Sequence, residues 1–315
     1  MKKPVLFLIF NRPETTFRVF EAIRAYQPTD LYIGADGPRA GNESDAVRCA
    51  EVRKVVEKVD WPCQVHTLFR EKNLGCRYAP SGAISWFFEQ EEEGIILEDD
   101  CLPSLDFFRF CEEMLDRYRE DTRIMHIGGV NFQDGQIRGN GSYYFSQIPH
   151  IWGWASWRRA WQNYDVEMSD FPAFVRDRKY TSVLSSYPYY QWYFVTVFKH
   201  SWKQSPWINT WDYQWHYTVL KMNGLTVVPN CNLVSNIGGA GTHDVSEDLC
   251  NIQLQTLPET IREPAVKDFD YEADLYTYRK TYSGGKYDRF KFIIFSFCKM
   301  LKLDVKFFRI PSCHK

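Results

Sequence analysis

The chain has 315 residues, 44% of them hydrophobic, which is enough to bury the core of one large domain or two small ones. A formal net charge of −2 argues against a general nucleic-acid binder. The nine cysteines form no CxxC pair, which predicts a reduced cytosolic protein without a disulfide framework or zinc site. No apolar run reaches about 20 residues, so no transmembrane helix is predicted.

Strand and helix signals alternate along the first 130 residues. Apolar runs bounded by glycine, proline or polar residues predict strands at 5–10, 31–35, 64–69, 95–98 and 123–130. Between them, helical periodicity predicts helices that begin at Pro13, run through Val59, span 73–93 and begin at Pro103. This alternation predicts an α/β fold with a mostly parallel sheet that is covered on both faces.

Aromatic residues become frequent in the second half of the chain. Strands are predicted at 143–146, 225–228 and 233–237, and a helix at 211–222. The glycine-rich stretch 237–243 fits either a flexible lid or an ordinary turn. Most aromatic residues of 187–217 are expected in the core, with Trp207 and Trp211 exposed.

Residues 286–315 form a basic, amphipathic tail. One helical face carries positive charge and the opposite face is apolar, the cations being Lys299, Lys302, Lys306 and Arg309. Two interpretations stay open, a helix lying on an anionic membrane surface and a C-terminal helix docked on the protein body.

Three consecutive acids, Glu98, Asp99 and Asp100, follow the apolar run that begins at Gly94. Carboxylates at the end of a buried strand repel one another unless a positive charge lies among them. A divalent cation with oxygen ligands supplies that charge and commonly carries a diphosphate. The alternative is an exposed loop in which the acids are solvated.

Polar residues also follow two other predicted strands. Asn11-Arg12 comes after the first strand and Asp36-Gly37 after the second. In open α/β sheets, ligands bind at the carboxyl ends of the strands. The three groups are therefore expected at one edge of the sheet, which favours the metal site over the solvated loop.

The order of these elements resembles that of the GT-A glycosyltransferases. The matching elements are Asn11-Arg12-Pro13, Asp36-Gly37, 73–77 and Glu98–Asp100 with Pro103 and Phe107 after it. In serial order, 153–157, 211–215 and 238–243 extend the similarity to the N-acetylglucosaminyltransferase I family, and bacterial family-two-like sugar transferases share the first half. The resemblance covers about residues 4–250.

This resemblance implies a Rossmann-type nucleotide-diphospho-sugar transferase fold with roles for particular residues. Residues 1–150 would be the nucleotide-sugar-binding half, 151–285 the acceptor-binding and catalytic half, and 286–315 the tail. Asp100 would bind the metal and Asp212 would be the catalytic base. The nucleotide sugar would contact Asn11, Arg12, Asp36, Arg77, Glu98, Asp99, Trp211 and His243.

The implied activity is a metal-dependent, inverting glycosyl transfer from a UDP-sugar, for instance UDP-N-acetylglucosamine. Mn²⁺ or Mg²⁺ would neutralise the leaving diphosphate, and a carboxylate would take the proton of the acceptor hydroxyl. The acceptor would be a glycan or lipid-linked glycan of bacterial surface polysaccharide synthesis. The protein would be cytoplasmic, peripheral on the inner face of the cell membrane.

Two other functions remain alternatives. A nucleotidyltransferase that forms nucleotide-sugars would require a glycine-rich, basic loop after the first strand, where this chain has Asn11-Arg12-Pro13. A non-catalytic carbohydrate-binding protein would explain the aromatic residues but not the clustered acids. For Asp212, the alternative to a base is an acid favoured by the dipole of a helix N-terminus.

Overall fold

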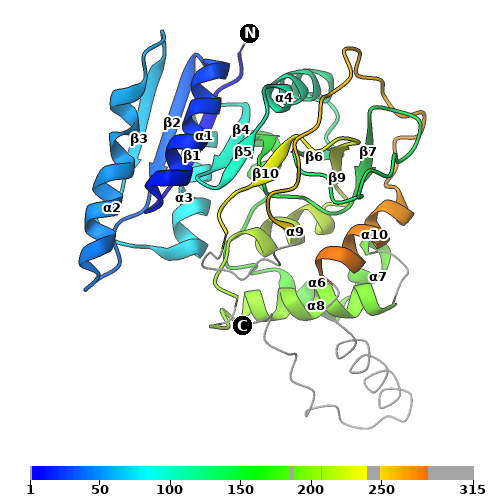
Figure 1. The fold of residues 1–315 in the computed structure, drawn as a ribbon. Coiled ribbons are helices and arrows are strands. Elements are labelled where there is room, and N and C mark those ends of the chain that lie inside the picture. Colours follow the sequence, from blue (N-terminus) through cyan, green and yellow to red (C-terminus); the bar gives the residue numbers. More distant parts are fainter. Residues whose placement is uncertain (1, 185–187, 207, 240–248, 283–315) are drawn as a thin grey trace.

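The computed structural model describes residues 2–184, 188–206, 208–239 and 249–282, which form an eight-stranded sheet flanked by helices (Figure 1). The strand order is β3-β2-β1-β4-β8-β6-β9-β7, and β7 and β8 run against the other strands. A separate two-stranded sheet pairs β10 with β5. The predicted α/β fold with a mostly parallel sheet is confirmed.

Strands and helices alternate along the first half of the chain, and helices dominate the second. The strands are β1 (Val5–Ile9), β2 (Asp30–Ala35), β3 (Gln64–Phe69), β4 (Glu93–Glu98), β5 (Cys101–Pro103), β6 (Ile124–Gly128), β7 (Tyr143–Ser146), β8 (Trp154–Trp157), β9 (Leu225–Pro229) and β10 (Val234–Asn236). The helices are α1 (Pro13–Tyr26), α2 (Glu43–Arg53), η1 (Lys54–Lys58), α3 (Gly75–Gln90), α4 (Leu105–Arg117), α5 (Arg158–Trp161), α6 (Phe171–Arg176), α7 (Tyr180–Val183), α8 (Pro188–Trp202), α9 (Asp212–Lys221) and α10 (Tyr271–Thr281).

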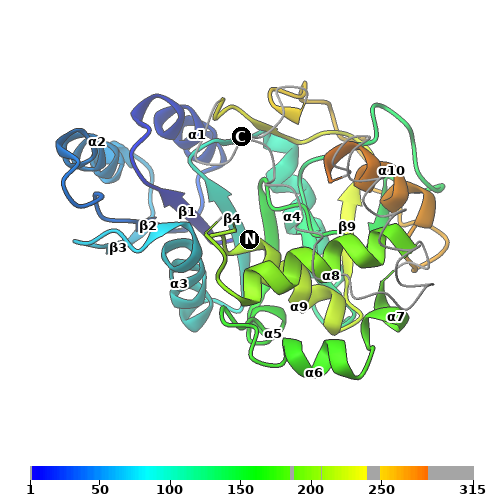
Figure 2. The same ribbon diagram turned by 90° about the horizontal axis from the view of Figure 1, so that it is seen from below.

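The two faces of the sheet are buried by different helices, as the view in Figure 2 shows. Along β1, Val5 and Phe7 join the cluster formed with α1 and α4, whereas Leu6 and Leu8 join the cluster formed with α3, α5 and α9. A strand that is covered on both faces needs apolar residues at successive positions, because neighbouring side chains point to opposite faces. This explains the continuous apolar runs that revealed β1 and β4.

The predicted boundaries differ from the structure at several points. The helix predicted over 73–93 ends at Gln90, because Glu93 already pairs in β4. The helix predicted from Pro103 begins at Leu105, where Ser104 caps it by accepting a hydrogen bond from the backbone N–H of Phe107. The helix predicted through Val59 becomes a 3₁₀ turn after Arg53.

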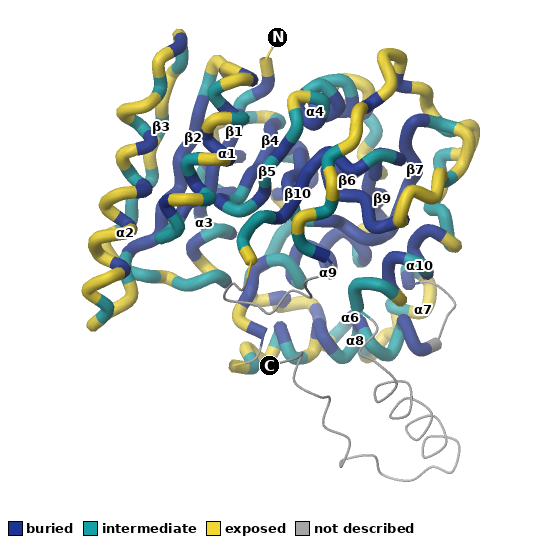
Figure 3. Tube along the Cα trace, in the orientation of Figure 1, coloured by how far each residue is buried: buried dark blue, intermediate teal, exposed yellow. Residues whose placement is uncertain are grey.

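Two strands that were not predicted link the halves of the chain. β8 comes from the second half and lies between β4 and β6 of the first half. β5 directly follows the acids and pairs antiparallel with β10, so that Asn236 faces Cys101. Figure 3 shows the central strands buried, while the edge strand β3 is more exposed. In the part of the chain that the structure describes, no helix is long and apolar enough to cross a membrane.

Candidate functional site

The three acids lie where β4 ends and turns toward β5. Glu98 is the last residue of β4, and the paired strand β1 ends beside it, since Leu8 and Glu98 are in register. The backbone N–H of Phe10 donates to Oδ2 of Asp99 over 3.2 Å. This bond joins the carboxyl ends of β1 and β4, so the two segments are in contact as predicted for neighbouring parallel strands.

Arg12 provides positive charge to this cluster. Its Nη1 atom donates to Oδ2 of Asp100 at 2.7 Å and lies 3.6 Å from Oδ1 of Asp99. Arg12 immediately precedes α1, whose first residue, Pro13, has a fixed φ. Pro13 also restricts the backbone conformations that are open to Arg12, the residue before it.

One guanidinium does not balance the negative charge of the cluster. Burial raises the pKa of Glu98 to about 8, an effect that Asp100, Asp99 and Asp212 increase and Arg12 opposes. Burial, followed by the charge of Asp100, raises the pKa of Asp99 to about 7. Oε1 of Glu98 is buried without a hydrogen-bond partner in the structure. The surroundings thus favour an additional cation or a shared proton.

Asp100 is more open to a metal ion than its neighbour Asp99. Its side chain is 18% exposed, compared with 10% for Asp99. Oδ1 of Asp100 lies 3.5 Å from Sγ of Cys101, which is fully buried, so Oδ1 faces the interior. No three His, Cys, Asp or Glu side chains converge to hold a metal among the described residues. The donor chemistry fits a hard cation that takes one ligand from Asp100 and the rest from a bound molecule or water.

The segment that follows β10 passes directly beside Asp100. The backbone N–H of Ile237 donates to the carbonyl oxygen of Asp100 over 2.8 Å. A Cβ atom on Gly238 would lie only 2.6 Å from Oδ2 of Asp100, so a larger residue here would have to displace the Asp100 side chain. The glycine-rich stretch thus contributes backbone to the site. His243 lies outside the described residues, and its contact with the nucleotide sugar stays a prediction.

The carboxylate of Asp36 accepts hydrogen bonds from the residue that follows it, from the loop that precedes α3 and from the first residue of α3. Its donors, at 2.9–3.1 Å, are the backbone N–H groups of Gly37, Leu74 and Gly75 and Nδ2 of Asn73. Asp36 therefore joins the end of β2 to the start of α3, where the dipole of the helix favours an anion. Its predicted contact with uracil stays a prediction, and a ligand would have to share these oxygens.

A buried acid that the sequence analysis missed holds Asn11 in place. Oδ1 of Asp45 accepts a hydrogen bond from Nδ2 of Asn11 at 2.7 Å, and both carboxylate oxygens accept from Arg39. The pKa of Asp45 is lowered to about 2, mainly by the hydrogen bonds from Arg39. No local pattern indicated this role, because Asp45 reads as an ordinary acid in the first turn of α2 and lies 34 positions from Asn11.

Asp212 is the first residue of α9 and lies within electrostatic reach of the acids. Burial is the main cause of the raised pKa of Glu98 and of the Cys76 thiol, and the charge of Asp212 adds to both. The start of α3, the start of α9 and the end of β4 therefore meet around these side chains. The role of Asp212 as a base stays a prediction.

Two other predicted site residues are buried. Trp211 is 1% exposed and packs on Trp154 with 5.7 Å between ring centroids, so the expectation that it is exposed is wrong. The reason is that α9 packs on the sheet, which encloses its first turn with the apolar cluster. Arg77 is also buried and donates to the carbonyl oxygens of Ser201 and Val166, so it links α3 to the second half of the chain.

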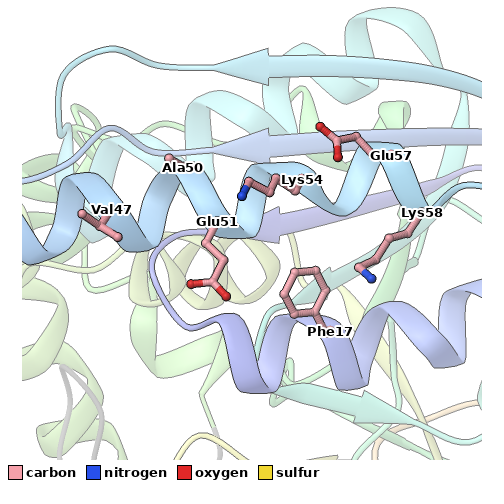
Figure 4. A pocket seen from close by; sticks show the side chains of 7 residues that line it. All are labelled: Phe17, Val47, Ala50, Glu51, Lys54, Glu57 and Lys58. Carbon is pink, nitrogen blue, oxygen red and sulfur yellow. The ribbon is translucent and has the colours of Figure 1, made fainter.

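A groove of about 760 Å³ lies elsewhere, between α1 and the α2–η1 segment (Figure 4). It is lined by Phe17, Val47, Ala50, Glu51, Lys54, Glu57 and Lys58. Its acids and lysines are evenly mixed, and none of these residues belongs to the cluster around Asp100. The groove therefore adds nothing to the chemistry of the acids.

No model of a protein family and no curated protein matches the chain. Among solved structures, mannosyltransferase PcManGT from Pyrobaculum calidifontis, in complex with GDP-Man and Mn²⁺, matches 52% of this chain and 48% of its own length, at 12% identity and a TM-score of 0.37. HddC from Yersinia pseudotuberculosis matches 51% of this chain and 80% of its own, at 11% identity and a TM-score of 0.33. A UDP-glucose pyrophosphorylase complexed with UDP-glucose matches 76% of this chain and 94% of its own, at 10% identity and a TM-score of 0.39. The match thus spans about half the length of the mannosyltransferase.

Proposed function

We propose that the protein is a metal-dependent, inverting glycosyltransferase that uses a UDP-sugar donor and a glycan or lipid-linked acceptor. The observation that carries this proposal is the meeting of Arg12 with Asp99 and Asp100 at the carboxyl ends of β1 and β4. Ligands of open α/β sheets bind at such ends. A partly exposed carboxylate beside a guanidinium can hold a metal and a diphosphate together.

In this proposal, each side chain has a separate task. Asp100 would hold Mn²⁺ or Mg²⁺, which when bound neutralises charge on the departing diphosphate. Arg12 would donate hydrogen bonds to phosphate oxygens. Asp212 would accept the proton of the acceptor hydroxyl as the new carbon–oxygen bond forms and the bond to the diphosphate breaks. A base on the face opposite the leaving group inverts the anomeric centre.

The connection between β1 and α1 favours glycosyl transfer over nucleotidyl transfer. It consists of Phe10, Asn11 and Arg12, with no glycine, and Pro13 already belongs to the helix. A nucleotidyltransferase would have to surround a triphosphate with backbone N–H groups, for which a glycine-rich loop is suited. These three residues are too few for such a loop.

The first experiment is a thermal-shift screen of nucleotide-sugars with and without Mn²⁺. A ligand at a hundredfold excess over its dissociation constant adds about 2.7 kcal/mol of stability. We expect a shift with a UDP-sugar that depends on Mn²⁺ and is lost in Asp100→Asn. Asp177→Asn, an acid paired with Arg176 at the end of α6, is the matched control and should behave as wild type.

Product analysis then separates the three functions. A glycosyltransferase hydrolyses or transfers from the UDP-sugar, whereas a nucleotidyltransferase releases pyrophosphate from UTP and a sugar 1-phosphate. A binding protein does neither. We expect Asp212→Asn to bind UDP as wild type does and to lose transfer by about 10²–10⁴-fold. Full transfer by this variant would remove Asp212 from the proposed role.

A further inference from the structure

The contact between Arg12 and Asp100 places two cations in competition for one carboxylate. Arg12 already donates to Oδ2 of Asp100 at 2.7 Å. The proposed function assigns the same carboxylate to a divalent metal ion, and the competition rests on that assignment. A metal ion and a guanidinium repel each other, so they do not share one oxygen without a loss of binding free energy.

The guanidinium of Arg12 and a metal ion would bind the same oxygen of Asp100, Oδ2. Oδ1 lies 3.5 Å from Sγ of the fully buried Cys101 and faces the interior. Oδ2 faces Arg12 and the backbone of Gly238, where a Cβ atom would stand 2.6 Å away. A cation that arrives from solvent therefore meets the oxygen that Arg12 occupies.

Arg12 has a second carboxylate within reach when it leaves Asp100. Its Nη1 atom is 3.6 Å from Oδ1 of Asp99, and the backbone N–H of Phe10 holds Asp99 through Oδ2. The Arg12 side chain is 28% exposed, so its outer face can meet an anion from solvent. A diphosphate that arrives with the metal offers such an anion.

We infer that Arg12 occupies the cation position at Asp100 in the free protein and yields it only when a nucleoside diphosphate engages the guanidinium. Metal alone then binds weakly, and metal and nucleotide strengthen each other's binding. Because such coupling is reciprocal, it can be measured through either ligand. In the protein without ligands, the guanidinium of Arg12 offsets part of the repulsion among Glu98, Asp99 and Asp100.

The experiment titrates the whole protein with Mn²⁺, with and without UDP, and follows free Mn²⁺ by electron paramagnetic resonance. In wild type, UDP should tighten Mn²⁺ binding by about 5- to 150-fold, the usual range of coupling between sites. In Arg12→Met, Mn²⁺ alone should bind about tenfold tighter than in wild type. UDP should then tighten Mn²⁺ binding by a smaller factor than it does in wild type. Arg18→Met, which removes an exposed cation from α1, the helix that follows Arg12, should reproduce the wild-type values.

Thermal unfolding would reveal whether Arg12→Met is folded. If it is not, a second variant, Arg12→Lys, still tests the inference. Arg12→Lys keeps the positive charge but lacks the planar group of donors of arginine. Its Mn²⁺ affinity without UDP should lie between those of wild type and Arg12→Met. The inference is overturned if Arg12→Met or Arg12→Lys, when folded, binds Mn²⁺ alone no tighter than wild type. If Mn²⁺ and UDP fail to bind wild type at all, the proposed function itself is wrong.

Discussion

Replacing Asp36 with alanine tests whether this carboxylate is part of the fold or is available to a ligand. Asp36 is 8% exposed, and four donors lie within 3.1 Å of its two oxygens. In Asp36→Ala, the backbone N–H groups of Gly37, Leu74 and Gly75 and the amide of Asn73 lose their acceptor. The first turn of α3 also loses the anion at its N-terminus.

The magnitude can be worked from these contacts. A hydrogen bond to a charged group contributes about 1.5–3 kcal/mol, and an anion at a helix N-terminus contributes about 0.3–1 kcal/mol. The donors do not add fully, because Leu74 is exposed and water can replace part of what is lost. We therefore expect Asp36→Ala to lower the free energy of unfolding by about 3–5 kcal/mol.

Urea unfolding followed by circular dichroism measures this loss, with an unchanged slope showing that the folded state is intact. Asp36→Asn keeps one acceptor oxygen and should lose less than the alanine variant. The control is Asp60→Ala, which removes an exposed acid paired with Arg24 and should leave the free energy of unfolding close to that of wild type. A loss below about 1 kcal/mol in Asp36→Ala, together with lost UDP binding, would refute the structural role and favour the contact with uracil.

Three further predictions address the site, the core and the tail. Gly238→Ala should weaken Mn²⁺ and UDP binding, because its Cβ atom would meet Oδ2 of Asp100 at 2.6 Å, whereas Gly128→Ala makes only ordinary contacts at 3.6 Å and should bind as wild type. Burial raises the pKa of Asp274 from 3.8 to about 7, so the unfolded chain loses this proton first and the free energy of unfolding falls as pH rises from about 4 to about 7. Between pH 4 and pH 7, the free energy of unfolding of Asp274→Asn should therefore rise relative to that of wild type by up to about 4 kcal/mol. Urea unfolding that gives the same difference between variant and wild type at pH 4 and pH 8 would contradict this. Deleting 286–315 should move the protein from membrane to soluble fractions, and unchanged partitioning would count against a tail that binds membranes.

The sequence predicted the part of the site that depends on local patterns. Continuous apolar runs indicated β1 and β4, and the rule that parallel strands end at one edge brought Arg12 close to Asp99 and Asp100. The first inference uses the spacing of residues within one element. The second joins Arg12 to Asp100, 88 positions away, through a general rule for parallel strands and needs no knowledge of how individual side chains pack.

The features that were missed depend on pairs of residues far apart in the chain. Asp45 contacts Asn11 across 34 positions, and β5 pairs with β10 across more than a hundred. The burial of Trp211 was missed for the same reason, because the first turn of α9 is enclosed only once the helix packs on the sheet. Local sequence specifies which face is apolar but not which surface covers it.

The pairing of β5 with β10 determines how Asp100 can act. It buries Cys101 beside Oδ1 of Asp100 and places the backbone of Gly238 beside Oδ2, so that one oxygen is enclosed and the other faces Arg12. The carboxylate is thus oriented before any ligand arrives, which lowers the cost of ordering it on binding. The same arrangement leaves three neighbouring acids with one guanidinium between them. A cation bound as proposed would relieve the repulsion that remains in the free protein, and this relief would contribute to its affinity.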